Sequence, residues 1–173
     1  MVPSVPSIEN YFQSLPPTPI NVGLFVGYKN LRNQVGVTPE ELVDESALEI
    51  MQENLARGMA EGAFGLSVGL EYYPQHRGTK EEMIALCQVL RERGGFYSTH
   101  IRNENHHVIP ALKEAIAIGL TAGVPVQYSH VKSSRREKLG KDAPIAVHDE
   151  GCGLCGFGYY RRCLPRIPFP ASM

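Results

Sequence analysis

Two histidines occupy matching places at the ends of successive predicted strands. His100 lies near the end of the predicted strand 96–101, and His130 lies near the end of the predicted strand 124–131. Adjacent parallel strands are about 4.8 Å apart, so imidazoles at equal heights can share one metal ion. Imidazole nitrogen suits zinc and similar divalent ions. The alternative is that each histidine is a core or loop residue satisfied by hydrogen bonds, and spacing alone does not decide between the two.

A second set of candidate metal donors lies near the C-terminus. It consists of one histidine and three cysteines with a C-x-x-C core, namely His148, Cys152, Cys155 and Cys163. These donors could bind structural zinc and make the segment a small zinc-binding interaction module. Their short, glycine-rich spacing leaves few residues that could orient the donors through hydrogen bonds. The fourth cysteine, Cys87, falls in a predicted helix and is interpreted as a small core side chain.

The elements that must position these residues alternate between strand and helix. Four short apolar runs are predicted to be buried strands, at residues 21–28, 62–70, 96–101 and 124–131. Helical patterns separate them, so the strands are expected to be parallel, with helices crossing over between them. In such folds functional groups gather where the strands end. Periodicity does not distinguish an open sheet from part of a closed barrel, because both bury the two faces of the sheet.

Helix boundary signals divide the segments between these strands. Capping-box patterns that begin at Thr38, Ser46 and Thr79 predict three helix starts. A further amphipathic helix is predicted over residues 108–118, and Gly119 is expected to close it.

Composition argues against two classes of partner. With a formal net charge of -1, the chain lacks the basic field that binds a nucleic-acid backbone. No run of about 18 apolar residues is present, which argues against a membrane span. Residues 1–20 hold five prolines and no Lys or Arg, so they are expected to form an irregular lead-in and not a secretory signal. A cytoplasmic location is the resulting expectation.

Longer motifs surround both histidines. They are NVGLFVGYKNLR (21–32), GAFGLSVGLEYYP (62–74), GGFYSTHIRNE (94–104) and VPVQYSHVK (124–132). In order and in spacing, these blocks resemble the N-acyl-D-amino-acid deacylases, or D-aminoacylases, of the amidohydrolase superfamily. The most specific part of the resemblance is T-H-x-R-x-E followed thirty residues later by S-H-x-K.

The resemblance implies a fold and a metal site. The catalytic domain of this superfamily is a (β/α)8 TIM-type barrel, and the matched blocks correspond to about its strands three to six. The α/β fold is therefore expected to be a partial barrel over residues 21–141. His100 and His130 match the metal-ligand histidines of strands five and six, and the metal is expected to be zinc or a similar divalent ion.

The same resemblance suggests residues that face substrate. Tyr72 is similar to a tyrosine that contacts substrate, while Arg102 and Lys132 each stand two residues after a ligand histidine, at the mouth of the barrel. A cationic side chain there could hold the carboxylate of an N-acyl amino acid. For Arg102, a salt bridge with Glu104 or another carboxylate at the barrel rim is an equal alternative.

Several parts of the family's active site have no counterpart in this sequence. It contains no H-x-H pair and no aspartate that matches the family's general base. Tyr28 stands where the family usually has the histidine of a G-H-G motif. No catalytic residue is therefore assigned, and the chain is expected to be inactive alone.

The segment 142–173 departs from the family pattern. Shifted by one nucleotide, its run FGYYRRCLP can read SGITADVYP, which is similar to a block that the family has at about this place. A frameshift or a sequencing error, followed by a premature stop, is the hypothesis for this segment, and resequencing the locus tests it.

The function that the resemblance implies is hydrolysis of a linear amide C–N bond, in which an N-acyl amino acid and water give an amino acid and a carboxylate. The alternatives are a dihydropyrimidinase-like cyclic amidase with the same fold and metal, and a non-catalytic fragment. Half a barrel would expose two strand edges and an apolar inner face, so self-association is expected.

Overall fold

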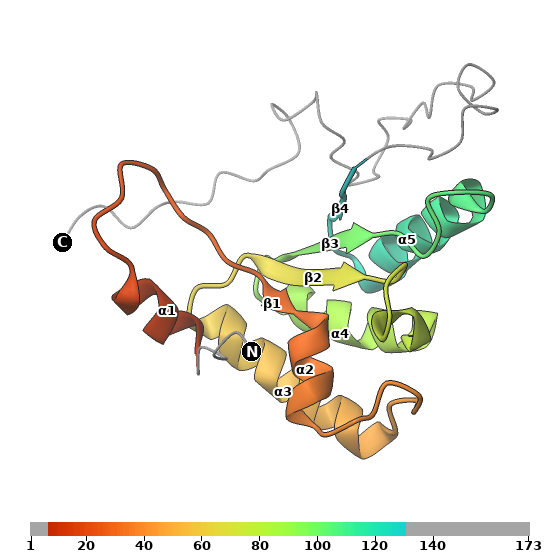
Figure 1. The fold of residues 1–173 in the computed structure, drawn as a ribbon, viewed down its shortest axis with the longest axis horizontal. Helices are drawn as coiled ribbons and strands as arrows, with labels where there is room; N and C mark the ends of the chain where they lie inside the picture. The colour runs from red at the N-terminus through yellow and green to blue at the C-terminus, as the bar shows by residue number, and fades with distance from the viewer. Residues whose placement is uncertain (1–6, 131–173) are drawn as a thin grey trace.

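The computed structural model describes residues 7–130, and its centre is a sheet of four parallel strands (Figure 1). The strands lie in the order β1-β2-β3-β4, so each pairs with the next along the chain. Their bounds are Val26–Gly27 (β1), Gly65–Gly69 (β2), Phe96–His100 (β3) and Val126–Tyr128 (β4). The expected α/β fold with parallel strands is confirmed.

The helices within residues 7–130 include one that precedes β1 and four that follow it, connect the strands and pack along the sheet (Figure 1). They are Ile8–Ser14 (α1), Tyr28–Gln34 (α2), Glu45–Ala60 (α3), Lys80–Glu92 (α4) and Val108–Ala122 (α5), with a short 3-10 turn at Gln75–Arg77 (η1). Helix α4 contacts β2 and β3 and lies between α3 and α5. None of the helices within residues 7–130 is long and apolar enough to cross a membrane.

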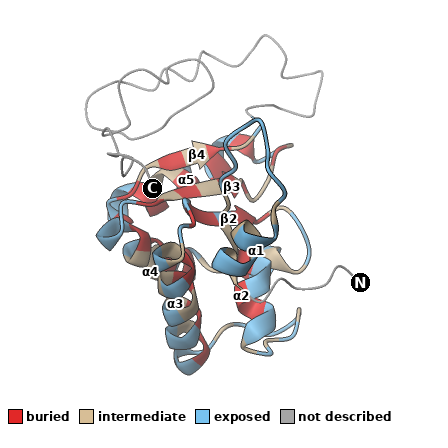
Figure 2. Cartoon of the chain, turned by 90° about the vertical axis from the view of Figure 1, so that its left-hand side faces the viewer, coloured by how far each residue is buried: buried red, intermediate tan, exposed pale blue. Residues whose placement is uncertain are grey.

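Buried residues lie on the strands and on helices α2 to α5, and together they form the core (Figure 2). Alternate strand residues point into it, and Leu66, Val68 and Tyr97 are all 3% exposed or less. Leu86 and Leu90 of α4 belong to the same buried cluster. Full burial of one aliphatic side chain contributes about 1.5–3 kcal/mol to the stability of the folded state. Because side chains alternate along a strand, burying these residues against the helices turns their neighbours to the opposite face of the sheet.

The face of the sheet that points away from the helices carries a row of polar residues across the middle of its strands. The strand register places Ser67, Ser98 and Gln127 side by side on β2, β3 and β4. Ser67 is exposed, and the other two residues are half-buried. The expectation of an apolar inner face is therefore wrong for this layer. Of the two reasons for expecting self-association, the edges remain, because β1 and β4 each pair with one neighbour among the described strands.

Aromatic side chains pack together near the amino ends of the strands. The rings of Phe25 and Phe96 stand edge to face, with centroids 5.0 Å apart. Gly65 is the register partner of Phe96, and a Cβ atom on it would lie 2.0 Å from the Phe96 carbonyl oxygen. The two central strands can approach this closely because Gly65 has no side chain.

The helix ends confirm one boundary signal and correct another. Thr79 is the N-cap of α4, and its hydroxyl accepts a hydrogen bond from the Glu82 backbone N–H at 3.1 Å. The predicted start at Ser46 is wrong by two residues, because the N-cap of α3 is Asp44. The Asp44 carboxylate accepts from the backbone N–H of Ala47 at 2.8 Å, and a carboxylate also suits the positive end of the helix dipole.

The predicted end of α5 is also wrong. Gly119 lies inside this helix, which continues to Ala122 and ends at Gly123 with a left-handed φ of 70°. A Cβ atom on Gly119 would lie 2.2 Å from Cγ2 of Val126. Gly119 therefore serves the close approach of α5 to β4, while Gly123 is the glycine that ends the helix.

Three further expectations differ from the structure. Thr38 starts no helix; its backbone N–H donates to the Glu41 carboxylate at 2.9 Å within a turn. The lead-in 1–20 is not wholly irregular, because it contains α1. Tyr28, expected at the end of a strand, is the first residue of α2.

Candidate metal site

The two histidines meet at the carboxyl ends of β3 and β4. His100 is the last residue of β3, and His130 lies two residues beyond the end of β4. Their Nε2 atoms are 3.2 Å apart, and their ring centroids are 4.4 Å apart. The structure thus brings together the two residues that the sequence analysis selected as metal ligands, although the ligand role itself stays a prediction.

The backbone of His130 explains how its ring reaches this place. Its φ is 58°, and no other non-glycine residue within 7–130 has a positive φ. This left-handed conformation costs of the order of 1 kcal/mol for a residue with a side chain, and strain of this kind concentrates at functional sites. The left-handed backbone at His130 is thus found at the residue whose ring contacts His100.

The separation of the two nitrogens suits a shared divalent ion. Two ligands placed tetrahedrally at Zn–N distances of 2.0–2.1 Å would have nitrogens about 3.3 Å apart, and here the distance is 3.2 Å. Without metal, the same contact is a hydrogen bond whose donor depends on the tautomers of the rings. Within residues 7–130 there is no group of three or more His, Cys, Asp or Glu residues that could hold a metal. The histidine pair could therefore supply two of the four ligands of a tetrahedral site, and this role stays a prediction.

Glu104 is the residue of this site that the sequence analysis missed. It was considered only as a partner for Arg102, but its Oε1 lies 3.5 Å from Nδ1 of His100. Its side chain is 3% exposed. The available signal was its position four residues after His100 in the T-H-x-R-x-E motif, which places a carboxylate in the loop that follows the ligand strand.

Tyr72 borders the histidine pair. Its ring stands edge to face with that of His100, at 5.2 Å between centroids, and the residue is 47% exposed. A Cβ atom on Gly69, the last residue of β2, would lie 2.9 Å from the Tyr72 ring, so a glycine leaves room for it. An exposed phenol beside the His100 imidazole is placed to touch a ligand bound there, and its substrate role stays a prediction.

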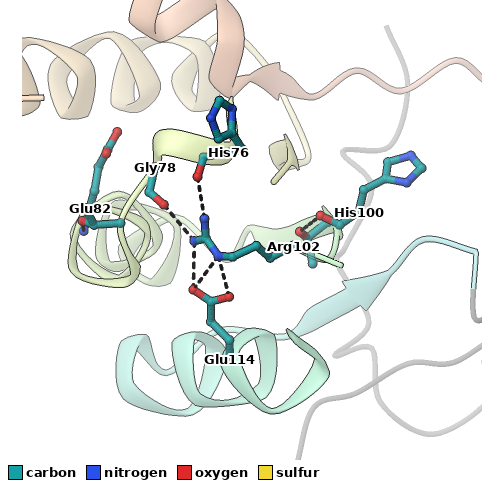
Figure 3. A network of polar contacts seen from close by, with 8 residues as sticks. His76, Gly78, Glu82, His100, Arg102 and Glu114 are labelled. Atoms are coloured by element: carbon teal, nitrogen blue, oxygen red, sulfur yellow. Dashed lines mark hydrogen bonds and ion pairs between the residues drawn. The ribbon is translucent and has the colours of Figure 1, made fainter. Parts of the chain in front are cut away.

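The Arg102 side chain points away from the His100 ring (Figure 3). Its guanidinium forms a bidentate ion pair with Glu114 of α5, with both N···O distances at 2.9 Å. It also donates to the carbonyls of His76, at 2.7 Å, and Gly78, at 2.8 Å. The Glu114 carboxylate raises the pKa of this guanidinium. Of the two interpretations left open, the structure shows the ion pair with a carboxylate, and that carboxylate is Glu114 and not Glu104.

Replacing Arg102 by methionine tests this interpretation. We expect the free energy of unfolding to fall by about 1–3 kcal/mol, since charge-assisted bonds to one carboxylate and two carbonyls are lost from a partly exposed site. Zinc affinity should stay within about twofold of the parent chain, because the imidazoles lie elsewhere. Urea unfolding and zinc titration measure both quantities. A variant of unchanged stability that had lost binding of N-acyl amino acids would instead support substrate contact.

The remaining expectations for this region lie outside the described residues. They concern Lys132 and the C-terminal donors His148, Cys152, Cys155 and Cys163. The substrate role of Lys132, the zinc module and the frameshift hypothesis stay predictions.

Tyr28 belongs to a buried polar network away from the histidine pair. Its hydroxyl donates to the Glu82 carboxylate at 2.7 Å and accepts from Arg32 at 3.2 Å. A Cβ atom on Gly78 would lie 2.6 Å from this hydroxyl. Burial, and then the Glu82 charge, raise the pKa of Tyr28. At the position where the family usually has histidine, this chain therefore has a phenol that joins α2 to the first turn of α4.

The carboxyl of Glu82 gives the chain a pH-dependent stability. Burial raises its pKa above the usual 4.5, although the hydrogen bond from Tyr28 and the charge of Arg32 act in the opposite direction. A group with a raised folded-state pKa binds its proton more tightly when folded. Its contribution is therefore fully present below pH 4.5 and is lost as the pH rises through the folded-state pKa.

We expect the substitution Glu82→Gln to remove this loss while keeping an acceptor for the Tyr28 hydroxyl. Relative to the parent chain, the variant should gain stability as the pH rises from 4.5 to neutrality. Urea unfolding at a series of pH values measures the difference. If the parent chain were instead favoured increasingly as the pH rises, the attraction between Glu82 and Arg32 would outweigh burial.

Comparison with known proteins relates this site to one group of enzymes. No family model matches the chain. It is 35% identical over 134 residues to D-aminoacylase from Alcaligenes xylosoxydans xylosoxydans, covering 76% of this chain and 28% of that protein. It is 33% identical over 169 residues to the N-acyl-D-aspartate deacylase of the same organism, covering 96% of this chain and 33% of that protein.

Solved structures agree. A D-aminoacylase described as defining a novel subset of amidohydrolases superposes with a TM-score of 0.74 at 32% identity, covering 78% of this chain and 29% of that chain. The N-acyl-D-glutamate deacylase of Bordetella bronchiseptica, solved with zinc and a phosphonate mimic of the tetrahedral intermediate, gives a TM-score of 0.67 at 32% identity, covering 70% and 26%. A third neighbour is a D-aminoacylase with a binuclear metal centre.

These neighbours have a TIM-barrel domain, so the four-stranded sheet is part of such a barrel, as expected. The chain spans between 28% and 33% of the length of the curated relatives that it matches. In sequence and in fold, the chain matches one part of the D-aminoacylases, which are N-acyl-D-amino-acid deacylases.

Proposed function

We propose that this chain forms the part of an N-acyl-D-amino-acid deacylase that supplies two ligands of its metal site. The observation that carries the proposal is the pair of Nε2 atoms, 3.2 Å apart, on the ends of successive strands. The reaction would split the amide of an N-acyl amino acid with water. A linear amide is preferred to the cyclic amide of a dihydropyrimidinase because the named relatives are deacylases.

The geometry supports limited roles for this chain's own residues. A divalent metal held by His100 and His130 would supply Lewis acidity toward the amide carbonyl and toward water. The exposed ring of Tyr72 would form one wall beside it. We assign no general base among the described residues, so a carboxylate for proton transfer must come from elsewhere in an active enzyme.

The substrate class follows from the same relatives. Deacylases for N-acyl-D-aspartate and N-acyl-D-glutamate match the chain about as well as D-aminoacylase does. We propose an N-acyl-D-amino acid as substrate, with Lys132 as the cation for its carboxylate. Arg102 is not proposed for this role, because its guanidinium is bonded to Glu114 and to two carbonyls.

The proposal is tested with the chain alone and then with a hybrid. Alone and loaded with zinc, the chain should release no more amine from N-acetyl-D-leucine than its His100→Ala variant does. In the hybrid, residues 21–130 replace the matching segment of the Alcaligenes D-aminoacylase. This hybrid should hydrolyse N-acetyl-D-leucine in preference to the L enantiomer, and His100→Ala should abolish the activity. A folded, zinc-bound hybrid that released no amine from any N-acyl-D-amino acid would contradict the proposal.

The proposal also includes two expectations, one about self-association and one about cellular location. Self-association through the edges of β1 and β4 would show as a mass above that of one chain in sedimentation. A cytoplasmic location also stays a prediction, and fractionation of the source cells tests it.

A further inference from the structure

The second ring nitrogen of His100 faces a carboxylate that has no assigned role. Nδ1 of His100 is shielded from solvent, and Oε1 of Glu104 lies 3.5 Å from it. The side chain of Glu104 is itself 3% exposed, whereas that of His100 is 26% exposed. The imidazole therefore has one nitrogen turned into the protein toward Glu104 and the other turned outward toward His130.

The chemistry of imidazole links these two contacts. A neutral ring carries its proton on one nitrogen and a lone pair on the other. A hydrogen on the shielded Nδ1 needs an acceptor within the protein, and the Glu104 carboxylate is placed to accept it after a small adjustment. Only this tautomer leaves the lone pair on Nε2, the atom 3.2 Å from Nε2 of His130.

The loop after β3 holds Glu104 in this place by its backbone as well. The Glu104 backbone N–H approaches the Glu71 carboxylate, at 3.4 Å, in the loop after β2. Glu104 follows His100 by four residues but lies before α5 begins at Val108, so its carboxylate is not placed by a helix. This contact joins the two strand-end loops and helps to place the Glu104 backbone near His100.

We propose that Glu104 is a positioning residue for the metal site, one that holds His100 in the tautomer with hydrogen on Nδ1 and Nε2 free to bind a divalent cation. The inference deepens the proposed function, since it concerns the same site. Carboxylates behind metal-binding histidines fix the orientation of the ring and raise its basicity as a ligand.

The first measurement needs no metal and no activity. Nitrogen-15 NMR of the full chain at mildly alkaline pH distinguishes the two tautomers of each histidine, and His100→Ala assigns the signals. The parent chain should show His100 with hydrogen on Nδ1. In Glu104→Leu this preference should give way to a mixture, whereas Glu104→Gln, which keeps an acceptor oxygen, should retain it.

Zinc titration of the same proteins supplies the second measurement. Glu104→Leu should weaken zinc binding by about 10- to 100-fold, and Glu104→Gln should restore part of the loss. The matched control is Glu71→Gln, which removes a nearby negative charge but keeps an oxygen that can accept from the Glu104 backbone N–H. It should leave the tautomer and the zinc affinity unchanged.

Each outcome separates this inference from the proposed function. His100 with hydrogen on Nε2 in the parent chain would overturn the inference, as would a folded Glu104→Leu variant with unchanged tautomer and zinc affinity. In either case, loss of zinc in His100→Ala would leave the proposed function standing. If Glu104→Leu does not fold, the parent chain and Glu104→Gln still decide the tautomer.

Discussion

Replacing either His100 or His130 by alanine is expected to weaken zinc binding by at least about 100-fold, or roughly 2.8 kcal/mol. The two rings present convergent Nε2 atoms 3.2 Å apart, and neither nitrogen alone can hold the ion in the same way. Zinc content after dialysis, measured by elemental analysis, and titration with a zinc indicator give the affinity of each variant.

The matched control for these variants is His107→Ala. His107 is exposed and precedes α5, where its side chain makes no capping hydrogen bond. This variant should bind zinc as the parent chain does. Zinc that remained bound in both His100→Ala and His130→Ala would show that the histidine pair is not the site, and the C-terminal cysteines would then be the donors to examine.

The substitution Gly65→Ala is expected to prevent stable folding. A Cβ atom there would lie 2.0 Å from the Phe96 carbonyl oxygen and 2.9 Å from its backbone nitrogen, so β2 and β3 would have to separate. Overpacking a core usually costs about 1–3 kcal/mol. A collision with backbone in the central strand pair should exceed that range, because no flexible side chain can move away. Thermal unfolding followed by circular dichroism measures the loss.

Gly27→Ala is the control for this prediction. Gly27 lies on the neighbouring strand β1, and a Cβ atom there would meet the Asn30 side chain at an ordinary 3.5 Å. Its stability should remain within about 1 kcal/mol of the parent chain. A Gly65→Ala protein that unfolded at the same temperature as Gly27→Ala would mean that β2 and β3 are not held in the register described.

The sequence predicted the order of the elements better than their ends. Apolar runs located all four strands, because burial against the helices demands them. Helix termini depended on packing as well as on local signals. Gly119 looks like a helix stop, yet its missing side chain serves contact with Val126 inside α5. Asp44 replaced Ser46 as a cap, and both are good capping residues, so the local pattern alone did not rank them.

The candidate site was predictable only where the strand ends position it. His100 and His130 were found because successive parallel strands end at the same edge of a sheet. The direction of the Arg102 side chain depended on its ion pair with Glu114, which lies on α5, and the spacing of the motif could not reveal this partner. The role of Tyr28 depended likewise on Glu82, which is distant in sequence and adjacent in the core.

The layer formed by Ser67, Ser98 and Gln127 bears on how such a barrel can be synthesised. A ribosome delivers strands one after another, so the interior of a barrel meets water before the last strands arrive. Hydroxyl and amide groups hydrogen-bond to that water, and their dehydration is postponed until the barrel closes. We therefore expect a partly synthesised barrel with this polar lining to aggregate less with other nascent chains than one with an aliphatic lining.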